Sequence, residues 1–87
     1  MTQAEKKELL KLQTKKGRSE TGLFLAEGVM LLEESLRFHY KPERVLFAGP
    51  LLNKRAEKLL LGFRRLKIPV EPVSTGEIEQ LSEAETS

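Results

Sequence analysis

The sequence predicts a small α/β fold, a three-layer α/β/α sandwich with a short and mostly parallel sheet. Three observations lead to this prediction. Short apolar stretches of strand length alternate with longer stretches whose apolar residues recur at helical spacing, the connections between them are short, and glycine or proline marks most of the boundaries. Alternation of this kind is typical of parallel strands joined by right-handed helical crossovers.

The chain begins with a predicted amphipathic helix over residues 3–13, with Thr2 as its N-cap. Residues 14–22 are predicted to form a loop, because Gly17 and Gly22 interrupt the helical pattern there. The apolar side of the helix consists of Ala4, Leu9, Leu10 and Leu12.

Residues 23–27 follow as the first predicted strand. Its first four residues are apolar, as expected of a strand covered on both faces, so Phe24 is assigned to the core. Gly28 permits a sharp turn, and a helix is predicted from there to Phe38. The face of this helix that should be buried carries Val29, Leu32, Ser35 and Leu36.

The remaining elements continue the alternation. A strand is predicted over residues 44–48, a helix over 51–66, and a strand over 68–73, whose two prolines favour an edge position. Ser74 is expected to cap a last short helix that reaches residue 80 or 81, with Glu77 in the capping-box position. The buried stripe of the longest helix is predicted to hold Leu52, Ala56, Leu59, Leu60 and Phe63.

Residues 1–81 are therefore predicted to form one domain. The polar and acidic residues 82–87 have the composition of a linker or tail, and we expect them to lead toward a further domain outside this chain. The sequence has no apolar run of membrane-spanning length and no signal-peptide pattern, so we expect a cytoplasmic protein.

The composition excludes several kinds of metal site and catalytic site. The chain has no cysteine and a single histidine, His39, which excludes thiolate metal sites and disulfides and leaves no histidine cluster. No phosphate-binding loop, dinucleotide fingerprint or nucleophile elbow is present, and no nucleophile–base pair can be assembled. A free-standing enzyme is therefore disfavoured.

The charge distribution is uneven. Residues 1–67 hold all fifteen basic residues and eight acidic residues, a net charge of +7, whereas residues 68–87 carry a net charge of −5. Within residues 1–18, six bases stand against two acids. A basic surface toward the N-terminus would suit a polyanionic partner, but a solvated lysine-rich face would give the same pattern, and charge alone leaves both open.

The candidate binding residues are Lys15, Lys16 and Arg18 of the predicted loop, with Glu27 and Gly28 where the first strand turns into a helix. A basic loop at the edge of a buried strand is suited to gripping a phosphate backbone. Glu27 stands where open α/β sheets place their sites, but the favoured interpretation is that its carboxylate fixes the backbone of the preceding loop or pairs with Arg18.

Five stretches together carry a family resemblance: KKGRSETGLFLAEG, VMLLEESL, PERVLFA, LKIPVEPVS and SEAETS. In this combination they resemble the N-terminal substrate-binding domain of the SpoU (TrmH) family of RNA 2′-O-ribose methyltransferases. The resemblance implies a sandwich similar to the kink-turn-binding ribosomal proteins and a structured RNA as partner, ribosomal RNA rather than transfer RNA. Those ribosomal proteins place Asn-Glu and a lysine where this chain has Glu-Gly and apolar Val29, so kink-turn recognition itself is not implied.

The resemblance also implies that recognition and catalysis belong to different domains of the parent protein. S-adenosylmethionine and the catalytic groups would belong to a separate C-terminal domain, so no catalytic or cofactor residue is assigned to this chain. Dimerisation would occur through that domain, so the parent would be a homodimer and this piece a monomer. The alternative from a different class is a non-catalytic protein-interaction or scaffold domain whose basic face only adds solubility.

Overall fold

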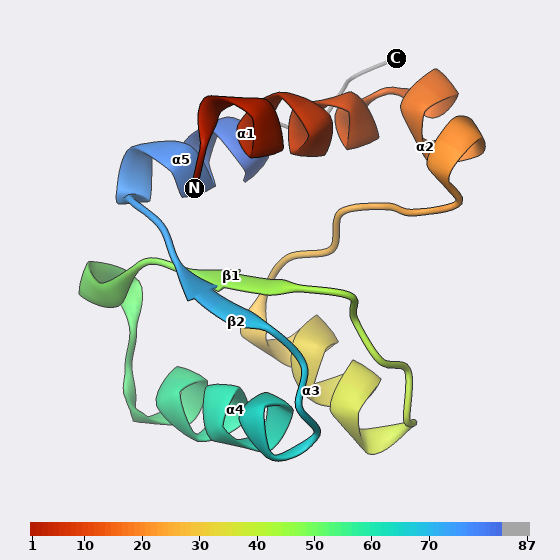
Figure 1. The fold of residues 1–87 in the computed structure, drawn as a ribbon. Coiled ribbons are helices and arrows are strands. Elements are labelled where there is room, and N and C mark those ends of the chain that lie inside the picture. The colour runs from red at the N-terminus through yellow and green to blue at the C-terminus, as the bar shows by residue number, and fades with distance from the viewer. Residues whose placement is uncertain (83–87) are drawn as a thin grey trace.

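The computed structural model describes residues 1–82, which form an α/β domain with a two-stranded parallel sheet (Figure 1). Short 3-10 turns at Lys11–Gln13 and Gly49–Leu51 complete the regular structure. The predicted linker or tail lies outside the described residues except for Ser82, which ends the last helix. The helices are α1 (Gln3–Leu10), α2 (Lys15–Thr21), α3 (Val29–Arg37), α4 (Lys54–Arg65) and α5 (Thr75–Ser82), and the strands are β1 (Val45–Phe47) and β2 (Val70–Pro72).

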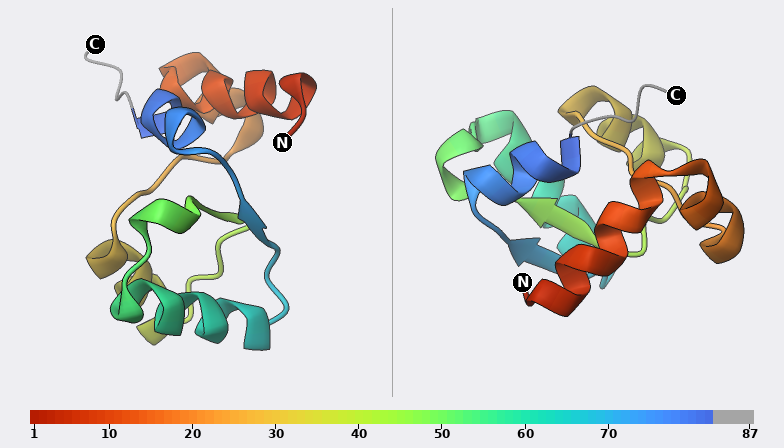
Figure 2. Two further views of the ribbon diagram at one scale, coloured as in Figure 1. Left: turned by 90° about the vertical axis from the view of Figure 1, so that its left-hand side faces the viewer. Right: turned by 90° about the horizontal axis from the view of Figure 1, so that it is seen from above.

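The helices lie in two layers with the sheet between them (Figures 1 and 2). Helices α3 and α4 cover one face, and α1, α2 and α5 lie on the other side. The strands pair in parallel with Val45 opposite Val70 and Phe47 opposite Pro72, and α4 is part of the connection between them. The predicted α/β sandwich is confirmed. Within residues 1–82, none of the helices is long and apolar enough to cross a membrane.

The core lies between the sheet and helices α3 and α4. Phe63 of α4 is completely buried at its centre, and Ala56, Leu59 and Leu60 of the same helix are also buried. Leu52 just before α4 and the predicted face of α3 pack partly buried around them, so the apolar stripes predicted for these two helices are confirmed. The core consists of Val45, Leu59, Leu60, Phe63 and Ile68, surrounded by Val29, Leu32, Leu36, Phe47, Leu52 and Val70.

Capping boxes are present at the starts of α1 and α5, where the sequence predicts an N-cap at Thr2 and a capping box at Ser74. The Thr2 hydroxyl accepts a hydrogen bond from the backbone N–H of Glu5, whose carboxylate in turn accepts from the backbone N–H of Thr2. Ser74 and Glu77 exchange the same pair of hydrogen bonds at the start of α5. Each box satisfies backbone donors that the helix itself leaves unpaired.

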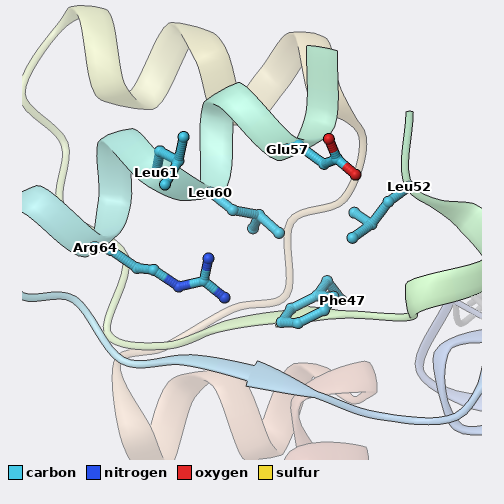
Figure 3. A pocket seen from close by; sticks show the side chains of 6 residues that line it. All are labelled: Phe47, Leu52, Glu57, Leu60, Leu61 and Arg64. Atoms are coloured by element: carbon cyan, nitrogen blue, oxygen red, sulfur yellow. The ribbon is translucent and has the colours of Figure 1, made fainter. Parts of the chain in front are cut away.

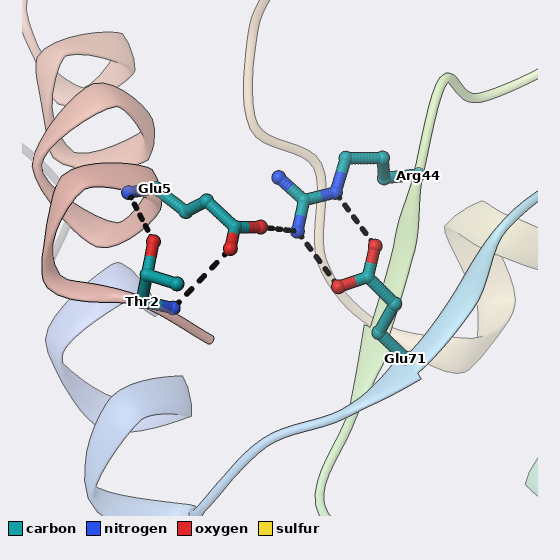
Figure 4. Close-up of polar contacts among 4 residues, drawn as sticks. All are labelled: Thr2, Glu5, Arg44 and Glu71. Carbon is teal, nitrogen blue, oxygen red and sulfur yellow. Dashed lines mark hydrogen bonds and ion pairs between the residues drawn. The ribbon is translucent and has the colours of Figure 1, made fainter.

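Arg44 ties the outer layer to the sheet (Figure 4). Its guanidinium donates two hydrogen bonds to Glu71 of β2, at 3.0 Å from Nε and 2.8 Å from Nη2, and Nη2 also lies 3.1 Å from a carboxylate oxygen of Glu5 in α1. Planar, two-pronged pairing of this kind is the strong form of an arginine–carboxylate contact. Glu5 therefore both caps α1 and anchors it to the strand region.

We expect the domain to lose stability in acid because folding lowers the pKa of three carboxyls, each below the ordinary value of 4.5. The pKa values of Glu5 and Glu77 are lowered mainly by hydrogen bonds from the backbone N–H groups of Thr2 and Ser74. The pKa of Glu33 is lowered mainly by a hydrogen bond from the Arg55 guanidinium. Since the unfolded chain takes up these protons at higher pH than the folded chain, the stabilisation is complete above about pH 5 and declines as pH falls through 4.5 toward the lower folded values.

Urea unfolding at intervals from about pH 7 to about pH 3 measures this decline. Glu5→Gln should make the decline shallower. Glu43→Gln, at an exposed glutamate that makes no hydrogen bond or ion pair with the described residues, should leave it unchanged. Stability that stays level or rises in acid would contradict the expectation.

Two predictions about residues 14–27 are wrong. The predicted loop 14–22 forms helix α2, and the predicted strand 23–27 is an unpaired segment that carries the chain from α2 to α3 in the opposite layer (Figure 1). Phe24 is accordingly 72% exposed and does not belong to the core. Apolar composition identifies a stretch that would fit a strand, but a strand also needs a hydrogen-bonding neighbour, and in residues 1–82 only β1 and β2 pair.

The predicted helix over residues 3–13 is confirmed in part. It is α-helical to Leu10 and continues as a 3-10 turn to Gln13. Leu12 is buried and Leu9 and Leu10 are half-buried, whereas Ala4 is exposed. The Gln13 side chain donates to the backbone carbonyls of Gln80 and Leu81, which joins this end of the helix to α5.

Candidate functional site

Helix α2 carries the predicted cations, and local contacts explain why this glycine-containing stretch is helical. Thr14 is the N-cap, with its hydroxyl accepting from the backbone N–H of Gly17 at 3.0 Å and donating to the carbonyl of Lys11 at 2.8 Å. Gly22 ends the helix in the left-handed conformation, with φ of 72°. Gly17 is buried against the backbone of Lys11, so this glycine permits a close approach between chain segments and does not interrupt the helix.

The three predicted cations have two different roles in the structure. Lys15 and Lys16 are exposed, and the Lys16 amine lies 3.9 Å from Glu20, one turn along the helix. A contact of that length between such exposed side chains leaves the lysine available to other anions. Arg18 is half-buried and donates from Nη1 to the backbone carbonyl of Leu12 at 3.1 Å. Lys15 and Lys16 can therefore meet a ligand, whereas Arg18 helps to hold α2 in place.

Glu27 and Gly28 lie apart from this cluster, at the start of α3 in the other helical layer. Gly28 has φ of 102° and is the residue before α3, which accounts for a glycine at the predicted turn. Glu27 is exposed, and among the described residues it makes no hydrogen bond or ion pair, to Arg18 or to any other group. The structure therefore does not bring the five predicted residues together into one site.

A hollow of about 360 Å³ lies between β1 and α4 (Figure 3). Leu60 and Phe47 form much of its apolar lining, and the guanidinium of Arg64 is 5.9 Å from the centre of the Phe47 ring. Glu57 is the one carboxylate in the lining, which holds no histidine, hydroxyl or second carboxylate to pair with it, so the hollow has no acid–base or nucleophile–base pair.

A second groove, of about 450 Å³, runs between α3 and α4 and was not predicted. We call it the α3–α4 groove. Arg55 lines the groove and donates from Nε to the carboxylate of Glu33 at 2.9 Å, which lowers the pKa of Glu33. Its basic residues come from two helices, so their proximity is not evident from the sequence. Its lining residues are Glu33, Leu36, Arg37, Arg55, Lys58, Leu59, Gly62 and Arg65.

The described surface gathers cations that are suited to binding anions. Four of the side chains that line the α3–α4 groove are cations and one is a carboxylate, and α2 presents two exposed lysines in the opposite layer. Within residues 1–82, no three histidine, aspartate or glutamate side chains gather where they would hold a metal ion. The described surface thus offers phosphate-binding cations at two separate places.

A family model for the MRM3-like substrate binding domain matches residues 4–87, nearly the whole chain. No curated protein and no solved structure shows a significant similarity to the chain. The matched range includes both basic surfaces and all of the fold's elements except the first residue of α1, and on this basis the chain belongs to the family of MRM3-like substrate-binding domains, the RNA-binding domains of a group of RNA methyltransferases.

Proposed function

We propose that this chain is the substrate-recognition domain of an S-adenosylmethionine-dependent methyltransferase that modifies ribose 2′-hydroxyls of structured RNA. Ribosomal RNA is the proposed substrate in preference to transfer RNA. The observation that carries the proposal is the match to a substrate-binding domain over residues 4–87, combined with the exposed lysines of α2.

The physical support comes from how α2 presents its charge. Lys15 and Lys16 stand in the first turn of a helix whose position is fixed by Thr14, Gly17 and Arg18. Cations on a fixed element lose less conformational freedom on binding than cations on a mobile loop. Structured RNA is recognised largely through its shape, its phosphates and its 2′-hydroxyls, for which such a helix is sufficient.

We place S-adenosylmethionine and the methyl transfer in a separate domain of the parent protein. The two hollows described above are open to solvent. One is lined mainly by leucine and phenylalanine, and four of the eight residues that line the other are cations. Neither lies beside a glycine-rich loop after a strand, so these residues do not fit the cofactor. We further propose that the parent is a homodimer through that domain and that this chain alone is a monomer.

Charge removal on α2 tests the proposal. Affinity for a ribosomal RNA hairpin should fall as salt rises, and Lys15→Gln/Lys16→Gln should weaken binding at low salt and reduce the slope of log affinity against log salt by roughly 1.5, since each phosphate contact contributes about 0.7–0.9. Lys6→Gln/Lys7→Gln removes the same charge from α1 and should have a smaller effect. Circular dichroism confirms that each variant is folded.

Equal affinity and slope for the α2 variant and the wild type would show that these lysines do not contact RNA. If the domain binds no RNA at any salt concentration, the protein-interaction alternative is favoured instead. The position of methylation is tested in a protein that joins this domain to its catalytic domain. A 2′-O-methylated nucleotide would make the following phosphodiester resistant to alkaline hydrolysis, because the 2′-oxygen can no longer attack the phosphate.

A further inference from the structure

We propose that the α3–α4 groove and the aromatic turn next to it bind an unpaired RNA strand. The aromatic turn is residues 38–40, Phe-His-Tyr, directly after α3. The partner class rests on the proposed function, since it takes RNA as the substrate, but the surface is separate from α2 and lies in the opposite helical layer (Figure 1). Phosphates would follow the basic groove, and bases would stack on the aromatic rings.

The charge of the groove is the first argument. Arg37, Arg55, Lys58 and Arg65 contribute four positive charges to the lining and Glu33 one negative charge. Glu33 is engaged by Arg55, so it opposes an incoming phosphate less than a free carboxylate would. Lys58 and Arg65 are exposed and make no hydrogen bond or ion pair within the described part of the chain. These two side chains are the ones available to phosphate.

The groove is held open in a fixed shape by close packing of its two helices. A Cβ atom added at Gly62 of α4 would lie 2.7 Å from Cδ2 of Leu36 in α3, so the helices approach each other closely at this point. The Glu33–Arg55 pair bridges them at a second point. The cations of both helices are thereby brought to one depression, rather than distributed over two independent surfaces.

The aromatic turn is the second and independent argument. Phe38 is 59% exposed and Tyr40 is 76% exposed, although most of the surface of a large aromatic side chain is buried in a typical protein. Arg37, which lines the groove, places its guanidinium 5.5 Å from the centre of the Phe38 ring, so the turn and the groove are continuous. An exposed aromatic ring beside a cation is the arrangement on which unpaired bases stack.

The backbone of the turn is fixed. The N–H groups of Phe38 and Tyr40 donate to the carbonyls of Glu34 at 2.9 Å and Ser35 at 2.8 Å. His39 has φ of 62°, the left-handed conformation that ends helices. The rings of Phe38 and Tyr40 are therefore attached to an ordered end of α3, which reduces the entropy cost of stacking a base on them.

An unpaired strand fits these features better than a duplex does. Bases in an A-form duplex are stacked on one another and their faces are not accessible, whereas bases of loops and bulges can be splayed onto aromatic side chains. Cations near helix C-termini also stabilise the helix dipole, which accounts for Arg37 and Arg65. That effect does not account for Lys58, in the middle of α4, or for the exposed rings.

Binding of oligouridine of about ten nucleotides tests the proposal, because that length suits a single-strand site and oligouridine has no stable structure. Lys58→Gln/Arg65→Gln should reduce the salt slope by about 1.4, at about 0.7 per lost contact on a single strand. Phe38→Ala/Tyr40→Ala should weaken binding by roughly 5- to 100-fold or more without changing the salt slope, since stacking is not ionic. The matched control Lys6→Gln/Lys7→Gln should leave both quantities near wild type.

Tyrosine emission gives a second measurement that does not depend on any variant. Tyr40 is the one tyrosine and the chain has no tryptophan, so oligouridine stacking should quench the intrinsic tyrosine emission of the protein. Unchanged emission together with unchanged affinity in both groove and aromatic variants would overturn the proposal. If the hairpin binds through α2 but oligouridine does not bind, the proposed function stands and this inference fails. If neither RNA binds, both fail.

Discussion

Replacing Phe63 with alanine is expected to lower the free energy of unfolding by about 3–5 kcal/mol, the cost typical of removing a buried phenylalanine side chain. Phe63 has 0% exposure and lies at the centre of the core formed by α4, β1 and their neighbours. The total stability expected of an 87-residue domain is about 4–13 kcal/mol. A single substitution here therefore removes a large share of the stability, and a domain near the lower end of that range would be largely unfolded.

Phe24→Ala is the matched control, because it removes the same atoms from a side chain that is 72% exposed. Its expected effect is within about 0.5 kcal/mol of zero, as for most surface substitutions. Urea unfolding followed by circular dichroism gives both values. Similar losses for the two variants would mean that Phe24 is packed, as the strand prediction for residues 23–27 required, and would contradict the structure described here.

The sequence predicts most of the core because helical periodicity is a repeated signal. In α4, the apolar residues recur over about two turns, and this is enough to identify Ala56, Leu59, Leu60 and Phe63 as one buried face. The capping boxes at Thr2 and Ser74 are also predictable, since each depends on two residues three positions apart. Signals contained within one element or one turn are thus recovered.

Features that depend on contacts between elements are not recovered. Glycine is typical of loops, so Gly17 predicts a loop by its residue type. Its close contact with the backbone of Lys11, which explains why a glycine stands within helix α2, is seen only in the structure. Residues 23–27 have the composition of a strand but no hydrogen-bonding partner strand among the described residues. In both cases the conformation depends on a partner from another part of the chain, and local composition does not identify that partner.

The candidate site shows the same division. Lys15 and Lys16 were identified because they are adjacent in the sequence, and they are exposed as a binding role requires. The α3–α4 groove was missed because its cations come from two helices, and their proximity depends on Gly62 packing against Leu36. A glycine within an otherwise strong amphipathic helix was the available signal, since it costs about 1 kcal/mol relative to alanine and therefore indicates a packing reason.

Gly17→Ala is expected to destabilise the domain even though alanine is the better helix former. An added Cβ atom would lie 2.0 Å from the carbonyl oxygen and 2.7 Å from the carbonyl carbon of Lys11, both backbone atoms that cannot rotate away. Forcing such an atom into a packed site costs about 1–3 kcal/mol. Alanine recovers about 0.5–1 kcal/mol through helix propensity and a less flexible unfolded chain. The clash is the larger effect, so we expect a net loss of about 1–2 kcal/mol.

The substitution should also affect the α2 surface specifically. To relieve the contact, α2 must move away from the Lys11–Gln13 turn, which disturbs the Arg18 hydrogen bond to Leu12 and shifts Lys15 and Lys16. Amide hydrogen exchange should therefore accelerate first in α2, and hairpin affinity should fall without any change of charge. Gly49→Ala is the control, because no atom lies within 4 Å of the added Cβ and the φ of Gly49 is not positive, so it should be nearly neutral. If Gly17→Ala were as stable as wild type and bound RNA equally well, α2 could not pack against Lys11 as closely as described, and the fixed position of its lysines would lose its physical basis.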